Sequence, residues 1–304
     1  MHKYLLVPLD GSRLAEAALP VAACLARGLH ASVTLLHIIE KDAPRAVHGH
    51  AHLTGPDEAL DYLEEVRRHA FAPDVAVERH VHTAEMSDVA RGIVEHAQEL
   101  APDLVVMCTH GRGGLRGLLF GSIAQQVVAQ GVIPVLLIPP RACQRRAPFV
   151  CRRLLVALEA SSRHDEALQP GAELARALQA VLHLLVVIPT LSTLAWDQAA
   201  PGKLSPSAMS TLLELEAGGA DDHIRQHEEE LRAQGLQATV EVRRGDPATV
   251  IVKAARRSES DLIVMGTHGR RGLDAMWAGS VAPKVCARSH LPLLLVPISE
   301  PGGS

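Results

Sequence analysis

Short apolar runs and longer amphipathic stretches alternate along the whole chain. Leu5–Leu9 and Leu104–Met107 are continuous apolar runs, as expected for strands that are buried on both faces. Between such runs, apolar residues recur every three or four positions, which is typical of a helix with one buried face. Strands and helices that alternate at these lengths predict an α/β fold in which parallel sheets carry helices on both faces.

The first half of the chain is predicted to form five strands and four helices, with Ser12 as the N-cap of the first helix. The strands are expected at Leu5–Leu9, Val33–Ile39, Val75–Val81, Leu104–Met107 and Val135–Ile138, and the helices at Ser12–Ala26, Asp57–Ala70, Ser87–Leu100 and Gly121–Gln130.

The second half follows the same order. Its strands are expected at Leu154–Leu158, Val181–Val187, Ala238–Val242, Leu262–Met265 and Leu293–Val296, and its helices at Arg163–Leu178, Ser207–Gln234, Pro247–Arg257 and Val281–Ala287. Two segments rich in loop-forming residues interrupt the rhythm and are expected to be surface loops, His48–Gly55 and Pro189–Pro206.

One block of sequence occurs twice. Met107–Leu115 reads MCTHGRGGL and Met265–Leu273 reads MGTHGRRGL, and each block is followed by a Gly-Ser pair and then by an apolar run closed by proline. The start of the chain repeats too, since LLVPLD at residues 5–10 matches LLVALE at residues 154–159. Repetition on this scale predicts two domains of one ancestry, at residues 1–140 and 152–304, joined by a linker at residues 141–151.

Composition excludes several functional classes. A net charge of −4 and an aromatic content of 2% argue against a nucleic-acid partner, which needs clustered cations or stacking platforms. No apolar run approaches the ~18 residues of a membrane span, and the N-terminal run is too short for a signal peptide. Five cysteines without CxxC spacing fit a reducing compartment. We therefore expect a cytoplasmic protein with no membrane partner.

Each repeated block begins at the end of a predicted strand and runs toward the start of a helix. Ligands bind at such strand ends in open parallel sheets. Glycine lets the backbone approach an anion closely, and the Gly-Ser pair offers N–H groups, a hydroxyl and the positive end of the helix dipole. Gly266, Gly269, Gly279 and Ser280 would form a two-part cradle for phosphates, with Arg270 as an added donor. The alternative is a tight turn that binds nothing.

The spacing Gly-x2-Gly-x9-Gly-Ser is neither the Walker pattern nor the dinucleotide pattern. This spacing, the VMGTHGR block and the opening LVPLDGS resemble the universal stress protein family, in tandem, over residues 3–140 and 152–298. The resemblance implies two doubly wound domains, each with a five-stranded parallel sheet that binds an adenine nucleotide. It also implies that the strand-1 aspartate contacts the adenosine and the glycine loop holds ribose and phosphates. A second branch of the family lacks the glycine motif and does not bind ATP.

The resemblance assigns nucleotide contacts to one set of residues in each copy. In the first copy these are Pro8, Asp10, Ile39, Met107, Thr109, Gly111, Arg112, Gly121, Ser122 and Ile123. In the second copy they are Glu159, Val187, Met265, Gly266, Thr267, Gly269, Arg270, Gly279, Ser280 and Val281.

Both copies depart from the family pattern. Cys108 stands in the first copy where Gly266 stands in the second; if this position needs a positive φ or a close backbone approach, the side chain costs about 1 kcal/mol or more. Glu159 replaces the aspartate in the second copy, so that a carboxylate remains with altered reach. The turn Gly245-Asp246-Pro247 has Ser87-Asp88-Val89 as its counterpart. Either site, or only one of them, could bind nucleotide.

The leading hypothesis is a stress-response module that binds ATP, with ADP or AMP as alternatives and Mg²⁺ as an optional companion, and signals to an unidentified protein partner. The resemblance suggests association along Val135–Ile138 and Leu293–Val296, as a homodimer or an internal pseudo-dimer of the repeats. The alternatives are a slow ATPase or nucleotide-dependent transferase, although no general base is evident, and a non-binding scaffold.

Two weaker patterns have ordinary explanations. His48, His50 and His52, with His80 and His82, suggest a metal site, but alternating histidines on a loop lack the fixed geometry of two histidines on a helix, and no metal is expected there. Cys108 could be redox-sensitive beside the loop, whereas a small buried residue at a strand end is the simpler interpretation.

Overall fold

The computed structural model describes residues 3–41, 46–47, 50–51, 53–109, 121–130, 133–139, 148–159, 165–190, 193, 206–268 and 281–298. These residues form two compact units. The first contains the described residues up to Val150 together with His290–Pro297, and the second contains the remainder from Cys151 onward.

The first unit is a parallel sheet with one added antiparallel strand. Its strands follow the order β5-β2-β1-β6-β7, all parallel, and β12 pairs antiparallel with β7. The elements are β1 Tyr4–Pro8, the 3₁₀ helix η1 Ala15–Ala18, α1 Leu19–Leu29, β2 Ser32–Glu40, β3 Ala46–Val47, β4 His50–Ala51, α2 Pro56–Ala70, β5 Val77–Met86, α3 Val89–Leu100, β6 Leu104–Cys108, α4 Ser122–Ala129, β7 Val135–Ile138 and β12 Leu293–Ile298.

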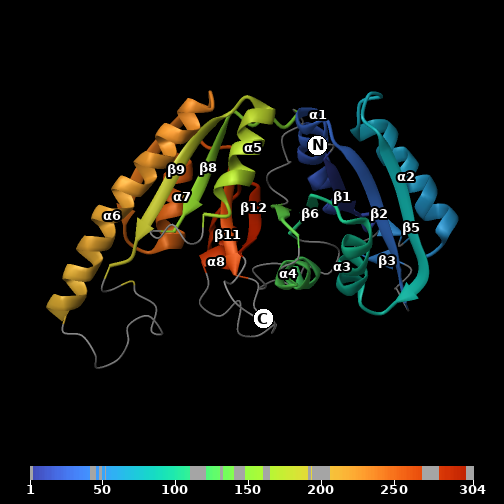
Figure 1. The fold of residues 1–304 in the computed structure, drawn as a ribbon. Coiled ribbons are helices and arrows are strands. Elements are labelled where there is room, and N and C mark those ends of the chain that lie inside the picture. Colours follow the sequence, from blue (N-terminus) through green and yellow to red (C-terminus); the bar gives the residue numbers. More distant parts are fainter. Residues whose placement is uncertain are drawn as a thin grey trace. The chain divides into compact units, whose positions relative to one another are not determined.

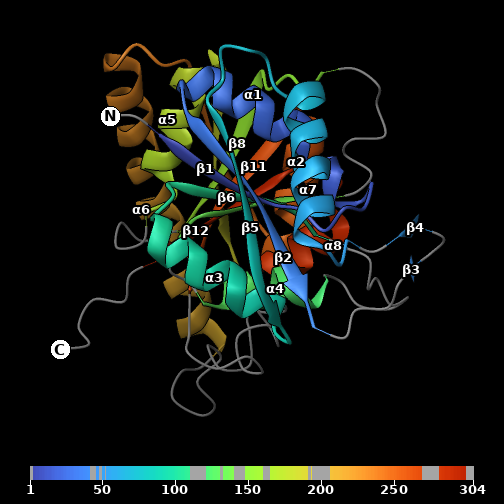
Figure 2. The same cartoon turned by 90° about the vertical axis from the view of Figure 1, so that its right-hand side faces the viewer.

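Helices cover both faces of this sheet. The chain moves outward from β1 through β2 to β5 by way of α1 and α2, and it returns to β6 and β7 by way of α3 and α4. Because right-handed crossovers that run in opposite directions place their helices on opposite faces, the two pairs of helices lie on either side of the sheet. Figure 2 shows this, with β5 at the near edge between α2 and α3.

The second unit repeats this plan. Its strands follow the order β10-β9-β8-β11, and all of them are parallel. The same crossover rule places α5 and α6 on one face and α7 and α8 on the other; Figure 1 shows the long α6 outside β9. The elements are β8 Arg153–Leu158, α5 Leu168–Leu178, β9 Val181–Ile188, α6 Pro206–Ala233, β10 Ala238–Arg244, α7 Pro247–Arg257, β11 Leu262–His268 and α8 Val281–Arg288.

The central strands are buried on both faces, as their apolar runs predicted. Leu5–Val7 in β1 and Leu154–Val156 in β8 have no exposed surface. The predicted class, two tandem α/β domains with mainly parallel strands and covering helices, is therefore confirmed. None of the described helices combines the length and the apolar composition that crossing a bilayer requires.

Matched polar contacts hold the central strand pairs of both units. Asp103, just before β6, accepts a hydrogen bond from the backbone N–H of Tyr4 through Oδ2 at 2.8 Å. Asp261, just before β11, accepts bonds from the N–H groups of Arg152 and Arg153 at 2.7 and 3.1 Å. An aspartate at this point thus satisfies backbone donors at the start of the neighbouring strand in each unit.

The first helix starts later than predicted. Ser12 Oγ accepts a hydrogen bond from the N–H of Ala15 at 3.1 Å, so Ser12 does cap a turn, but that turn is the 3₁₀ helix η1. The α-helix begins only at Leu19, because Pro20 has no N–H to give to the preceding turn and favours a first-turn position.

Other predicted boundaries are wrong as well. Strand β5 runs to Met86 rather than to Val81, because β2 continues to offer backbone partners as far as Glu40. The segment His48–Gly55 was expected to be loop, yet His50–Ala51 forms β4 and pairs antiparallel with Ala46–Val47. Of the predicted loop Pro189–Pro206, only residues 189, 190, 193 and 206 are described.

Left-handed residues end the same helices in both units. His30 and Gln179 follow α1 and α5 with φ of 51° and 54°, and Ala101 and Glu259 stand at or near the ends of α3 and α7 with φ of 45° and 52°. Glycine usually takes such positions, because a Cβ makes this conformation unfavourable.

We expect Ala101→Gly to raise the free energy of unfolding by about 0.5–1 kcal/mol. The left-handed conformation costs an L-residue about 1–2 kcal/mol, and the greater freedom of glycine in the unfolded chain offsets part of the gain. Denaturant unfolding measures the change. Ala90→Gly, inside α3, is the control and should lower stability by about 1 kcal/mol. A loss of stability with Ala101→Gly would contradict the expectation.

Candidate functional site

Strand order reverses once in each unit, and the reversal defines where a ligand can enter. In the first unit the chain leaves β1 toward β2 and returns to β6 on the other side of β1; in the second unit the corresponding strands are β8 and β11. Crossovers diverge to opposite faces at such a point, which leaves a crevice beyond the carboxyl ends of the two strands.

The carboxyl ends of these strands carry predicted site residues at matching levels. The β1–β6 ladder pairs Leu5 with Leu104, and the same register brings Asp10 level with Thr109. The β8–β11 ladder pairs Met265 with Ala157, and its register brings Glu159 level with Thr267. The register therefore puts a carboxylate and a threonine at the same level of neighbouring strands in each unit.

Asp10 is held in a compact turn. Its Oδ1 accepts a hydrogen bond from the N–H of Ser12 at 2.9 Å, and Gly11 between them has φ of 75°. An aspartate that bonds the backbone two residues onward forms an Asx turn, which fixes the direction of the carboxylate. Asp10 remains half-exposed at the end of β1, where a ligand could reach it. Glu159 is exposed, and the five residues after it lie outside the described part.

The glycine-rich segment of the first unit leaves and returns at one point. Thr109 donates its N–H to Ile138 O at 2.9 Å, and Gly121 donates its N–H to Thr109 O at 2.6 Å. The intervening residues, with the predicted contacts Gly111 and Arg112, lie outside the described part. Thr109 is buried, with 2% of its surface exposed. The segment is thus anchored at the strand end that the register aligns with Asp10.

Helix α4 begins at this anchor with its first backbone donors available. Gly121 is the N-cap residue and supplies no side-chain cap, so the N–H groups of Ser122 and Ile123 have no partner within the helix. Ser122 is exposed and Ile123 is half-exposed. Aligned N–H groups at a helix start attract anions, so this end of α4 fits a phosphate group.

The other predicted contacts of the first copy are less accessible. Pro8 is half-buried at the end of β1, whereas Met107 is buried in β6 with 5% exposed. Ile39 is 3% exposed and belongs to a core cluster with Leu53 and Ala59. Five of the predicted contacts therefore lie at the carboxyl ends of β1 and β6 and at the start of α4: Asp10, Thr109, Gly121, Ser122 and Ile123. Ile39, by contrast, is a core residue of β2.

The second copy is described only in part. Met265 is buried in β11, while Thr267, Val187 and Val281 are half-buried in β11, in β9 and at the start of α8. The remaining predicted contacts, Gly269, Arg270, Gly279 and Ser280, lie outside the described part.

Gly266 lies in a strand. The prediction that this strand ends at Met265 is wrong, because β11 continues to His268. A Cβ added to Gly266 would lie 2.5 Å from Ile298 Cδ1 and 2.9 Å from its Cγ1, so glycine leaves room for the Ile298 side chain. Neither Gly266 nor Cys108 has a positive φ. The strain considered for Cys108 therefore does not arise; this residue is buried in β6 opposite Ile138.

The matched turns before α3 and α7 both use aspartate as the N-cap. Asp88 accepts a bond from Arg91 N–H at 3.0 Å, and Asp246 accepts one from Thr249 N–H at 3.0 Å. In the second unit Arg288, at the end of α8, also donates to Asp246 at 3.0 Å. Hydrogen bonds from Thr249 and from this guanidinium hold the pKa of Asp246 below its usual value. The turns at Ser87-Asp88-Val89 and Gly245-Asp246-Pro247 therefore serve as helix caps in this chain.

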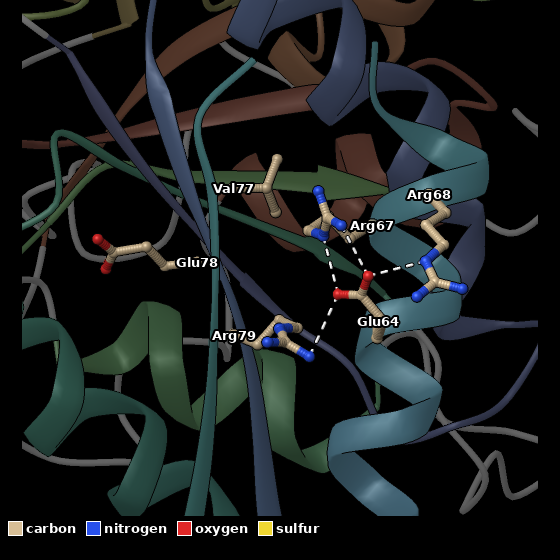
Figure 3. Close-up of a pocket in the computed structure, with 6 residues that line it drawn as sticks. All are labelled: Glu64, Arg67, Arg68, Val77, Glu78 and Arg79. Atoms are coloured by element: carbon tan, nitrogen blue, oxygen red, sulfur yellow. Dashed lines mark hydrogen bonds and ion pairs between the residues drawn. The ribbon is translucent and has the colours of Figure 1, made fainter. Parts of the chain in front are cut away.

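A surface depression with three arginines lies at the start of β5, away from the carboxyl ends of the strands. Glu64 on α2 accepts from Arg67 and Arg68 on the same helix and pairs with Arg79 on β5 at 3.2 Å (Figure 3). The hydrogen bond from Arg67 is the main reason that the pKa of Glu64 falls to about 2. All three guanidinium groups already pair with the Glu64 carboxylate. The pair with Arg79 links α2 to the edge strand β5.

Two histidine clusters depend on partners that the sequence did not indicate. In the first, His82 Nδ1 lies 3.0 Å from His96 Nε2, and His80 packs edge-on against the His96 ring. His80 and His82 alternate along β5, so the relevant partner is His96 on α3; the side chains of residues 48–52 lie outside the described part. In the second, Asp165, His223 and His227 converge. The spacing of four residues on a predicted helix was the available signal for the His223–His227 pair.

We expect the His96 cluster to make the fold sensitive to mild acid. Burial, followed by the neighbouring His80 and His82, lowers the pKa of His96. The unfolded chain then binds a proton more readily than the folded one, so stability is complete above the ordinary pKa of about 6.5 and is lost as pH falls below it. The melting temperature should therefore drop between pH 7.5 and pH 5.5, and His96→Gln should reduce the drop.

His69→Gln is the matched control for this measurement. His69 is exposed on α2, and its replacement should leave the pH dependence unchanged. If His96→Gln and His69→Gln change the pH dependence of the melting temperature equally, His96 is not the cause of that dependence.

The fold and the reversal of strand order in each unit define a duplicated, doubly wound α/β protein. A model of the universal stress protein family matches residues 1–139 and again residues 151–297. The chain belongs to the universal stress protein family.

Some known relatives match nearly the whole chain, and others match about half of it. A universal stress protein of Mycolicibacterium smegmatis is 26% identical over 312 residues, which cover 96% of each chain. The crystal structure of a universal stress protein from Archaeoglobus fulgidus covers 98% of this chain and 97% of its own, with a TM-score of 0.65 and 16% identity. A universal stress protein crystallised in complex with cAMP covers 46% of this chain and 98% of its own, with a TM-score of 0.34 and 19% identity.

Proposed function

We propose that this chain binds adenine nucleotide, ATP in the first instance, in the crevice between β1 and β6, and that partner proteins respond to the bound state. The observation that carries the proposal is the convergence of Asp10, Thr109 and the open start of α4 at the reversal of strand order. Asp10 as a partner for a ribose hydroxyl and the N–H groups at the start of α4 as partners for phosphates support this assignment.

The first unit is the better supported of the two sites. Asp10 is oriented by its bond to Ser12 and remains half-exposed, and Gly121 anchors the loop to Thr109. In the second unit Glu159 is longer and exposed, and Gly266 serves the packing of Ile298. We propose that the second copy binds more weakly, through Thr267, Val281 and the glycine-rich segment between them.

The proposal extends to a metal ion, a cellular location and an association of the repeats. Mg²⁺ would accompany the phosphates, and the cytoplasm, where ATP is abundant, is the proposed location. We propose that the repeats associate along their last strands.

Native mass spectrometry and thermal unfolding of the untagged full chain test the proposal. Protein purified without added nucleotide should carry ATP, ADP or AMP. After removal of nucleotide, ATP at 100 times its Kd should stabilise the fold by about 2.7 kcal/mol, or about 5–10 °C. ADP, AMP, cAMP and GTP complete the panel. Absence of bound nucleotide together with absence of any thermal shift would overturn the proposal, and a larger response to GTP would overturn the choice of adenine.

A further inference from the structure

Two histidines and one aspartate meet outside the proposed nucleotide site. His223 and His227 are one turn apart on α6, the long helix at the left of Figure 1, and Asp165 lies in the turn that leads into α5. All three belong to the second unit. Their side chains are only 17%, 14% and 15% exposed, so the fold has largely removed three polar groups from water.

The three side chains direct one atom each to a common point. Asp165 Oδ2 lies 2.7 Å from His223 Nε2 and 2.9 Å from His227 Nε2, and the two nitrogens are 3.1 Å apart. Ligand atoms on one face of an octahedral ion with bonds of about 2.1 Å are roughly 3.0 Å apart, and those around tetrahedral zinc are roughly 3.3 Å apart. The observed triangle therefore has close to the dimensions of one face of a metal coordination shell.

When both histidines are neutral, hydrogen bonds alone do not satisfy all three atoms of this triangle. His227 Nδ1 lies 3.4 Å from Glu230 Oε2, and donation of its N–H to that carboxylate makes Nε2 of the neutral ring an acceptor. This Nε2 then faces Asp165 Oδ2 and His223 Nε2. A proton on one nitrogen can satisfy one pair of these atoms, whereas a cation at the centre satisfies all three. In metal sites, a ligand histidine commonly donates the N–H of its other ring nitrogen to a carboxylate in this way.

Buried negative charge gives a second, independent reason for a cation. Asp165 Oδ1 and Glu166 Oε2 are both inaccessible to water, and neither has a hydrogen-bond partner among the described residues. Among the described residues, only the two histidines form hydrogen bonds with the Asp165 carboxylate. A buried carboxylate oxygen without a partner is unfavourable, and a cation bound by Asp165 would offset part of this cost.

We propose that Asp165, His223 and His227 bind one divalent transition-metal ion, with zinc(II) as the first candidate and with the remaining coordination positions open. Two imidazoles and one carboxylate select zinc, cobalt, nickel or ferrous iron over magnesium and calcium, which prefer oxygen ligands. The ion links His223 and His227 on α6 to Asp165, which lies just before α5. Asp165 lies six residues after Glu159 in the sequence.

Zinc competition against a chromophoric chelator tests the site on untagged, EDTA-treated full chain. One tight equivalent is expected in the wild type. Asp165→Asn and His223→Gln should each weaken it by 100-fold or more, and Glu230→Gln by about 10–100-fold, because that carboxylate only orients His227. Cobalt(II) provides a readout without any substitution, since its visible bands distinguish four-coordinate from six-coordinate nitrogen and oxygen ligation.

Two control variants address the other histidines in a chain that has 17 of them. The double variant His69→Gln/His290→Gln removes two exposed histidines, and the triple variant His48→Gln/His50→Gln/His52→Gln removes the alternating run; both should keep the tight equivalent. Circular dichroism of the metal-free variants checks that each is folded. The proposal is overturned if the wild type binds no tight equivalent, if Asp165→Asn and His223→Gln retain it, if the triple variant loses it, or if magnesium binds in preference.

Discussion

Ser122→Asp is expected to lower the affinity for ATP by about 100-fold without destabilising the protein. Ser122 is the first residue of α4 and is exposed at the point where the phosphates are proposed to bind. A negative charge there repels the triphosphate and competes for the same N–H groups. The same charge interacts favourably with the helix dipole, by about 0.3–1 kcal/mol. Affinity and stability should therefore change in opposite directions, which a merely disruptive substitution does not produce.

Ser122→Asn is the matched control because it has nearly the same shape and no charge. It should keep affinity within a few-fold of the wild type. Calorimetric titration with ATP and thermal unfolding without nucleotide measure the two quantities. Ser280→Asp, at the matched sequence position, then reports how much of the remaining binding belongs to the second copy. Equal ATP affinity in Ser122→Asp and wild type would show that the phosphates do not lie at the start of α4.

Gly171→Leu is expected to lower the free energy of unfolding by about 3 kcal/mol. Gly171 is in the first turns of α5, where a Cβ would lie only 2.8 Å from Cγ2 of Val156 in β8. Val156 is completely buried and, being β-branched, has little rotamer freedom with which to move aside. Insertion of a larger side chain forces the helix away from the sheet, and overpacking of this kind typically costs about 1–3 kcal/mol or more.

Alanine substitutions separate packing from helix propensity. Gly218 on α6 has no atom within 4 Å of an added Cβ, so Gly218→Ala should stabilise the chain by up to about 1 kcal/mol. Gly171→Ala gains the same propensity but meets Val156, and it should be neutral or destabilising. Adding Val156→Ala should recover part of the Gly171→Ala loss in a double-mutant cycle. Stabilisation by Gly171→Ala equal to that of Gly218→Ala would show that the helix–sheet distance is not limiting.

Most of the architecture could be predicted because it depends on local pattern. The runs at Leu5–Val7 and Leu154–Val156 are apolar throughout, and the structure buries them on both faces. Errors occurred where a local pattern was weak. The end of the edge strand β5 is polar, so its extension to Met86 could not be predicted from an apolar pattern. Helix α1 begins only at Leu19, next to Pro20, and not in the turn that Ser12 caps.

The candidate site was predictable in outline only. Repetition and spacing indicated the segments, and strand topology brings Asp10, Thr109 and Gly121 to one edge. The role of Gly266 was not predictable, since it depends on contact with Ile298, which lies 32 residues later in the sequence. The His223–His227 spacing was visible in the sequence, but its importance depends on Asp165, which the sequence does not mark as a neighbour.

The sequence by itself determined the order of strands and helices, the duplication and the residues at the strand ends, because periodicity, helix caps and repeats are local properties. Only the tertiary structure decided which glycines are required by packing, that His96 belongs with His80 and His82, and that Asp165 meets two histidines of α6. Such contacts depend on how helices pack on a sheet, where residues distant in the chain come within a few ångströms of one another.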